Sequence, residues 1–408
     1  MEVNSSYNRE NYYQNMYNMF GGYNPVTDKQ ASSLRRLGML AGTAMILYIL
    51  MQKLFIFLLS ITNAVELYRQ DAVYMNGLNI FAQVLYILVP FLIVFLLSKP
   101  GERAKMIIFE KPANTLVTVY AVFTGIAICV VSNFASGLIT SLFSVLGVDF
   151  LSGSEDMPMP KNIIGIILMV LCNAVVAPLL EEFAFRGVLL QPLRKHGDRF
   201  AIVVSALIFG LMHGNMVQAP FAFIVGLALG YFCVATGSIW TSVAIHSLNN
   251  LWATLFSIYS ESQSEIDGVV YYAIQFILLA IGIVAFIDFR KHNTFKMKKV
   301  KSGMNRNLRL ALYLCTPTVV IGISDCIYST ITLQNTTSLL GLLVLVALII
   351  VIGVFVSRGT KLIQTDTRLT QSKLYSVSKV MTAVFVVLGI IATVIFATSS
   401  MLSGITGN

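Results

Sequence analysis

Long runs of apolar residues, separated by short polar segments, occupy most of the chain. Because about 20 apolar residues in a helix cross the hydrocarbon core of a bilayer, these runs predict membrane-spanning helices. The predicted spans lie near 37–60, 80–98, 115–146, 162–191, 200–213, 219–236, 239–258, 269–287, 310–333, 338–357 and 377–402. The pattern therefore predicts an all-α polytopic membrane protein with a core of about eight helices at 37–290 and a transmembrane appendage of about three helices at 310–402.

The composition agrees with a membrane protein and excludes a soluble domain. Of the 408 residues, 56% are hydrophobic and only 12% are charged. The formal charge of +9 does not indicate a nucleic-acid partner, because the Lys and Arg residues fall in short clusters between apolar runs. The five cysteines occur singly, without a CxxC pair, and are expected to be reduced packing residues.

Charge alternates between successive loops, as the positive-inside rule requires. The basic loops contain Lys99, Arg103, Lys105, Lys111, Arg194, Lys195, Arg199, a dense stretch from Arg290 to Arg309, Lys361, Arg368 and Lys373. The acidic loops contain Glu66, Asp71, Asp149, Glu155, Asp156, Glu261, Glu265 and Asp267. This alternation predicts a cytoplasmic N-terminus and an external C-terminus.

Two segments outside the spans differ in composition from the rest of the chain: one is rich in Asn and Tyr, and the other is basic. Residues 1–33 hold six Asn and five Tyr within the first 24 positions, which predicts a disordered cytoplasmic tail. The first apolar run follows this tail, so we expect insertion through internal spans rather than a cleavable signal. Residues 288–309 form a basic connector, which we expect at the anionic cytoplasmic surface between the core and the appendage.

Three ionisable residues occur within the fourth apolar run, in the sequence PLLEEFAFRG that begins at Pro178. An ionisable group near the bilayer centre costs at least roughly 2.5–3.5 kcal/mol, so such groups persist mainly where they are paired or functional. Glu182 and Arg186 are four residues apart and can form an ion pair on a helix, whereas Glu181 is rotated by about 100°. We expect a structural role for the pair and a chemical role for Glu181.

Two of the four histidines, His213 and His246, also fall inside predicted spans. Asn250 lies about one turn after His246 on the same helical face, and Phe209, one turn before His213, is expected to form a pocket wall. A rise of about 1.5 Å per residue from the basic loops places Glu181, His213 and His246 at similar depths, roughly 12–20 Å into the membrane. The pattern predicts a water-accessible site within the membrane.

These segments resemble the signature of the CAAX protease and bacteriocin-processing (CPBP, also called Abi) family of intramembrane proteases. The pattern EExxxR matches Glu181, Glu182 and Arg186, FxxxH matches Phe209 and His213, and HxxxN matches His246 and Asn250. The resemblance covers roughly 37–290, with the motifs between 178 and 250. It implies an eight-helix CPBP-type core that hydrolyses a peptide bond in a membrane-anchored protein or hydrophobic peptide.

The resemblance also implies a setting and a mechanism. Bacterial members are associated with bacteriocin immunity or peptide maturation, which suggests the bacterial cytoplasmic membrane, and eukaryotic members act on prenylated proteins. The residues and the resemblance together suggest that Glu181, aided by His213, takes a proton from water. His246 and Asn250 would stabilise the oxyanion, and Arg186 would hold Glu182.

Other interpretations of the same residues stay open. A divalent metal such as zinc, held by His213, His246 and Glu181, would lower the pKa of a bound water. The chain lacks HExxH, so the preferred mechanism has no obligatory metal. A non-catalytic scaffold of the same fold is a further alternative, as is a proton-coupled transporter, since buried Glu and His residues also build proton relays.

Overall fold

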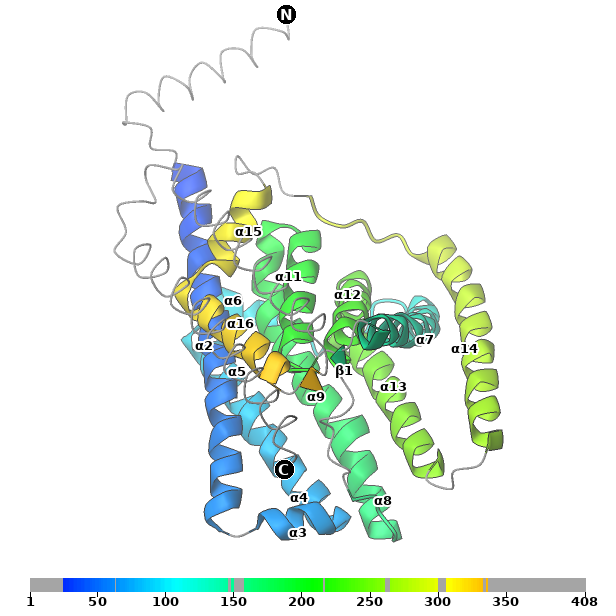
Figure 1. Ribbon diagram of the computed structural model, residues 1–408. Coiled ribbons are helices and arrows are strands. Elements are labelled where there is room, and N and C mark those ends of the chain that lie inside the picture. The colour runs from blue at the N-terminus through cyan, green and yellow to red at the C-terminus, as the bar shows by residue number, and fades with distance from the viewer. Residues whose placement is uncertain are drawn as a thin grey trace, which may run out of the picture.

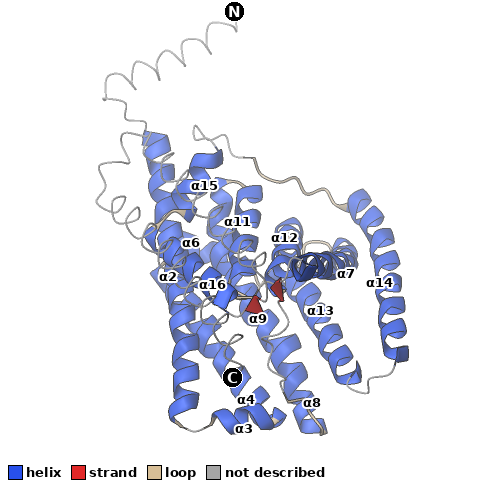
Figure 2. Ribbon diagram, in the orientation of Figure 1, coloured by secondary structure: helices blue, strands red, loops and turns tan. Residues whose placement is uncertain are grey.

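The computed structural model describes residues 25–62, 64–145, 148–149, 158–215, 217–260, 265–299, 306–332 and 335–336, and nearly all of them are helical (Figure 2). In the first half lie α2 (Pro25–Ile61), α3 (Val65–Gln70), α4 (Ala72–Gln83), η1 (Val84–Leu88), α5 (Val89–Leu97), α6 (Pro100–Met106), α7 (Thr115–Val145) and β1 (Val148–Asp149). The next segment contains α8 (Ile163–Val170), η2 (Leu171–Val176), α9 (Ala177–Glu182), η3 (Phe183–Leu190), α10 (Gln191–Leu193) and η4 (Arg194–His196). The remaining elements are α11 (Asp198–Leu211), α12 (Gln218–Thr236), α13 (Ile239–Ser260), α14 (Glu265–His292), α15 (Arg306–Leu314), α16 (Pro317–Thr332) and β2 (Asn335–Thr336). The predicted all-α membrane fold is confirmed, with one short antiparallel pairing of β1 with β2 among the described residues.

Fewer helices qualify as spans than the sequence predicted. Six helices of the described chain are long and apolar enough to cross a membrane, or seven if the bent pair α15 and α16 forms one span. The predicted spans at 200–213 and 239–258 are helices, but α11 has only 14 residues and α13 carries many polar side chains. The predictions at 338–357 and 377–402 lie outside the described residues.

The segment predicted as one span at 310–333 is two helices, α15 and α16. It packs against the core rather than forming a separate appendage. The chain bends by 79° between the helical segments that end at Leu314 and begin at Pro317, because proline cannot continue the hydrogen bonding of the preceding helix. Both segments pack against α2, and Tyr313 and Val319 belong to the same hydrophobic core as Leu34 of α2. This part of the chain is therefore continuous with the core.

Gly42 of α2 allows this helix to pack closely against α16. A Cβ at Gly42 would lie 2.2 Å from the backbone nitrogen of Val319, whereas a Cβ at Gly77 of α4 would meet nothing within 4 Å. We therefore expect Gly42→Ala to lower the free energy of unfolding by about 1–3 kcal/mol through overpacking. Gly77→Ala, the matched control, should be neutral or stabilising because alanine favours helix. Unfolding in mixed micelles measures both, and equal effects would contradict the close packing.

The helix α2 also begins earlier than predicted. It starts at Pro25, so residues 25–33 belong to a helix and the prediction of a disordered tail is wrong for them; residues 1–24 lie outside the described chain. Proline is favoured in the first helical turn. Ala31 and Leu34 are buried, and Ser33 Oγ lies 3.2 Å from His196 Nε2. Tertiary contacts thus extend the helix beyond the apolar run.

The basic segments gather at one end of the bundle. Figure 1 places the start of α2, α15 and the connector after α14 at this basic end, with α3, the start of α8 and the end of α13 at the other. Glu102 of α6 accepts hydrogen bonds from Arg36 and from Lys195, the latter at 2.8 Å. This arrangement agrees with the predicted alternation of basic and acidic loops, while orientation across the membrane stays a prediction.

Glu102 makes the stability of the fold depend on pH. Burial alone would raise the pKa of this carboxyl, but the hydrogen bonds and charges of Lys195 and Arg36 outweigh it, so the pKa is lowered. A lowered pKa stabilises the fold above the unfolded value and loses that effect as the pH falls through the folded value. Glu102→Gln should therefore cost about 1 kcal/mol at pH 7 and less at about pH 4, below the unfolded value of about 4.3. Unfolding at both pH values measures this, with exposed Glu66→Gln as control; a pH-independent cost would contradict it.

Candidate active site

π-Helical turns interrupt two of the predicted spans: η1 lies in the second span, and η2 and η3 lie in the fourth. The π segments η1, η2 and η3 end at Leu88, Val176 and Leu190, and each is followed by a proline, Pro90, Pro178 and Pro192. A proline ring clashes with the carbonyl four residues earlier and leaves it without a donor, and a wider turn relieves that clash. Such π turns are rare and occur frequently at functional sites. Two of the three segments flank Glu181 and Glu182.

A buried ion-pair network forms immediately beside η3. Glu182 Oε1 lies 3.0 Å from Arg186 Nη1 and 2.9 Å from His246 Nδ1 of α13, and the side chains of Glu182 and Arg186 are both fully buried. The guanidinium lies over the ring of Phe209, 4.3 Å from its centroid, and Nη2 donates to Gly226 O at 3.5 Å. The predicted ion pair is thus present, and through it residues from the fourth span, α11, α12 and α13 meet at one point.

Glu181 faces a different environment from Glu182. Its side chain is 18% exposed, and Oε2 lies 3.8 Å from His246 Nε2. This oxygen is buried and has no hydrogen-bond partner among the described residues. Glu181 also lines a cavity of ≈ 150 Å³. The two adjacent carboxylates therefore differ as their helical spacing suggested: Glu182 is held through Oε1 by Arg186 and His246, whereas Glu181 lines the cavity.

His213 lies across the same cavity from α9. It follows the last turn of α11, where its Nδ1 lies 2.8 Å from Phe209 O, so Nε2 is the ring nitrogen left for other partners. The ring of Phe209 contacts both histidines edge-on, at 4.8 Å from His213 and 5.9 Å from His246. Phe209 is a wall of the cavity. Glu181 and His213 thus line one cavity, and His246 lies beside it, against Phe209 and Glu181.

Asn250 forms a hydrogen bond that links two helices, which the sequence did not predict. Because η2 shifts the hydrogen bond of the Ala177 amide to Cys172 O, the carbonyl of Asn173 is free to accept from Asn250 Nδ2 at 3.0 Å. Asn249 Nδ2 donates to Asn250 Oδ1 at 3.2 Å. Asn250 therefore connects α13 to the π turn η2 through one of its two amide N–H groups.

Sequence reasoning missed two polar residues of the cavity, Tyr48 of α2 and Gln218 of α12. The Tyr48 hydroxyl accepts from Gln52 Nε2 at 2.8 Å and donates to Met212 O at 3.4 Å. Neither residue belongs to a recognisable motif. The only sequence signal is a helical pair of polar groups, Tyr48 and Gln52, inside the first apolar run.

The metal hypothesis stays a prediction. The described residues contain no group of three or more His, Cys, Asp or Glu side chains that could hold a metal ion. The Nδ1 atoms of both histidines contact protein groups, Phe209 O for His213 and Glu182 for His246, so Nε2 of each ring is the nitrogen that could hold a metal. The mechanism proposed below uses side chains alone.

Comparisons with known proteins agree with the geometry. The family described as "Type II CAAX prenyl endopeptidase Rce1-like" matches residues 163–252, which contain every motif residue from Glu181 to Asn250. The chain is also 27% identical over 103 residues to the Bacillus subtilis (strain 168) protein named "Putative membrane peptidase YdiL". That match covers 24% of this chain and 42% of the relative, so the chain matches less than half of the relative's length. No solved structure matches the chain. The segment that carries the buried charged residues, 163–252, is thus similar to the Rce1-like family of CAAX prenyl endopeptidases.

Proposed function

We propose that the protein is an intramembrane endopeptidase that hydrolyses a peptide bond in a membrane-anchored protein or hydrophobic peptide. One observation carries the proposal: Glu181 faces a buried cavity, with His246 Nε2 3.8 Å from its carboxylate, while the neighbouring Glu182 is fixed by Arg186. A free carboxylate beside an oriented imidazole is an arrangement suited to activating water. The family match to membrane endopeptidases supports the same reaction.

Charge balance assigns a role to His246. Glu181, Glu182 and Arg186 together carry a net negative charge when both carboxylates are ionised. A positive imidazolium at His246 would neutralise the buried network, and buried charges are stable only when compensated. Glu182 then accepts from Nδ1, and the Nε2–H donor lies 3.8 Å from Glu181 Oε2.

The proposed reaction begins with proton transfer from water to Glu181. The water oxygen forms a bond to the scissile carbonyl carbon, and the π electrons of the carbonyl move to its oxygen. The resulting oxyanion accepts from His246 Nε2–H and from the second amide N–H of Asn250. The tetrahedral intermediate then collapses, the C–N bond breaks, and the proton held by Glu181 passes to the leaving amine. His213 Nε2 would orient the water.

The cavity lining favours an apolar substrate. Besides Glu181, His213, Tyr48 and Gln218, the cavity is lined by Ile87, Phe91, Phe185, Phe209 and Met212. Buried apolar walls with few polar groups select hydrophobic chains and exclude bulk water. We therefore propose a hydrophobic segment at the cleaved bond, as in a membrane-inserted peptide, a bacteriocin precursor or a lipid-modified tail.

Substrate trapping tests this function. Glu181→Gln keeps the shape of the side chain but cannot take a proton, so it should hold uncleaved substrate. We expect mass spectrometry of the variant, isolated from native membranes, to identify a membrane-bound peptide that wild-type protein cleaves in vesicles. The matched control is Glu66→Gln, at an exposed carboxylate of α3. Partners that are identical on both variants and stay uncleaved would indicate the scaffold instead.

A further inference from the structure

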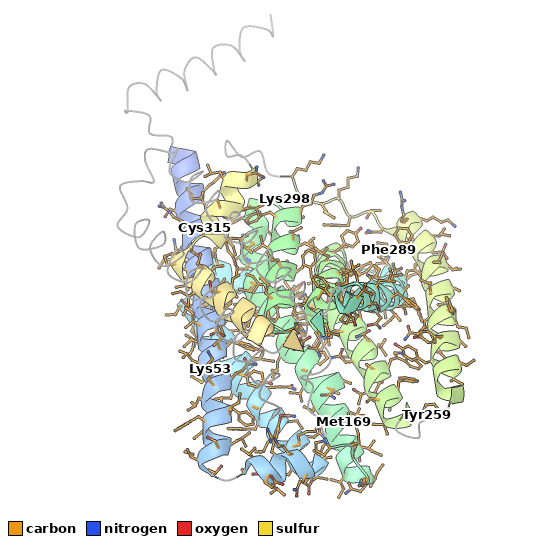
Figure 3. All side chains as sticks on the ribbon, in the orientation of Figure 1. Lys53, Met169, Tyr259, Phe289, Lys298 and Cys315 are labelled. Atoms are coloured by element: carbon orange, nitrogen blue, oxygen red, sulfur yellow. The ribbon has the colours of Figure 1, made fainter. Side chains whose placement is uncertain are left out.

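A second, larger cavity lies at the basic end of the bundle. It measures ≈ 970 Å³ and is bounded by the start of α11, by Tyr231 of α12, by residues 295–299 and by α15. It shares no lining residue with the cavity at Glu181. Figure 3 labels Lys298 of its rim near the ends of α11 and α15. We refer to this cavity as the basic pocket.

The rim of the basic pocket carries positive charge without a counterion. Its cations are Arg199, Lys296, Lys298, Lys299 and Arg309, and its lining contains no Asp or Glu. Within the described chain, the ion pairs at this end join Glu102 to Arg36 and Lys195, Asp198 to Arg194, and Asp288 to Lys291, so none includes a cation of the rim. An anion in the pocket would therefore meet several unopposed charges.

Backbone hydrogen bonds hold part of this rim in place. Lys298 N donates to the buried Asp198 Oδ2 at 2.7 Å, and Asp198 N donates to Lys298 O at 3.3 Å. Arg309 Nη1 donates to His196 O at 2.8 Å, while its buried Nε has no hydrogen-bond partner among the described residues. The positions of these cations are therefore set by the fold.

The deeper wall of the basic pocket is apolar. Phe200, Val203, Tyr231, Phe295 and Leu310 line it, and Val203 is 43% exposed. Val203 lies five residues after the first residue of α11, roughly 8 Å along the helix axis. The pocket therefore changes from cationic to apolar over about the depth at which lipid headgroups give way to acyl chains.

We propose that the basic pocket binds an anionic phospholipid, with its phosphate at the cationic rim and the upper part of its acyl chains against Val203 and Tyr231. A free phosphate would use the rim alone and leave the apolar wall uncovered. A nucleic acid would likewise contact the cationic rim and leave the apolar wall uncovered. The proposal concerns a site outside the candidate active site and does not depend on the proposed function.

Photo-crosslinking of lipid to the full-length protein tests this. The protein is placed in phosphatidylcholine vesicles that contain a trace of phosphatidylglycerol with a diazirine on its acyl chain, and labelled peptides are identified by mass spectrometry. We expect labelling around Val203 and Tyr231 that unlabelled phosphatidylglycerol competes away. Arg199→Gln/Lys296→Gln/Lys299→Gln, which changes exposed residues only, should reduce labelling about tenfold or more. Val203→Trp, which fills the apolar wall, should reduce it with the rim intact.

The control removes the same number of cations from the same end. Arg103→Gln/Lys105→Gln/Lys111→Gln changes residues that do not line the pocket, and it should leave the labelling within about twofold of wild type. Equal losses in the two triple variants would overturn the proposal in favour of general surface attraction. Equal labelling by a phosphatidylcholine that carries the same diazirine, competition by inorganic phosphate, or labelling elsewhere would overturn it as well.

Discussion

Glu181→Gln should lower the rate of peptide cleavage by about 10²–10⁴-fold, the usual contribution of a general base, and leave the stability of the fold nearly unchanged. The catalytic loss follows from the position of Glu181 at the cavity, 3.8 Å from His246 Nε2. The small structural effect follows because the described ion-pair network is held by Glu182, Arg186 and His246 Nδ1. Cleavage of the trapped peptide in vesicles gives the rate, and unfolding in mixed micelles gives the stability.

Two comparisons make this prediction specific. Glu66→Gln removes a carboxylate from exposed α3 and should leave both rate and stability unchanged. His246→Ala should also abolish cleavage, but with a loss of stability, because it leaves the buried Glu182 with one partner fewer. If Glu181→Gln retains more than a tenth of wild-type cleavage, Glu181 is not the general base.

Several features of the site could be predicted from the sequence because helical geometry links residues that are close in the chain. The i,i+4 spacing predicted the pair of Glu182 with Arg186, and the same geometry separated Glu181 from it. Depth along each span also predicted that His213 and His246 lie near each other, and both rings contact Phe209. Such inferences need only the helix parameters and the ends of the apolar runs.

Features that depend on three-dimensional contacts could not be predicted from the sequence. The contact of His246 Nδ1 with Glu182 joins residues 64 positions apart, and apolar periodicity does not specify which helix faces which. Asn250 matches a motif position, yet its hydrogen bond to Asn173 O arises from the π turn η2. Prolines within the apolar runs were the available signal for such turns, since each proline removes a donor and displaces a carbonyl.

The errors in the predicted spans have a common physical origin. Apolar windows measure local composition, whereas helix ends are set by capping, proline and tertiary contact. Pro317 therefore divided an apolar run that a window treats as continuous, and packing of Ala31 and Leu34 extended α2 into a polar segment. A short or polar helix such as α11 or α13 is stabilised by its neighbours rather than by its own hydropathy.

Arg186→Met should have the largest effect on folding, lowering the free energy of unfolding by about 3–5 kcal/mol. The substitution leaves the fully buried Glu182 without its guanidinium, and an uncompensated buried charge carries a cost of this size. Lys291→Met is the control, because Lys291 and Asp288 of α14 form an ion pair whose side chains are both partly exposed, 65% and 32%. Its cost should be about 1 kcal/mol or less.

The double variant Glu182→Gln/Arg186→Met separates the structural role of the pair from its catalytic one. Removing both charges should recover most of the stability, because no ionised group is left unpaired between these two positions. Cleavage should stay at least about 10²-fold below wild type, since a neutral amide at position 182 supports an imidazolium at His246 less well than a carboxylate does. Full recovery of cleavage would show that the pair serves only to hold the helices together, and that His246 acts without a charged partner.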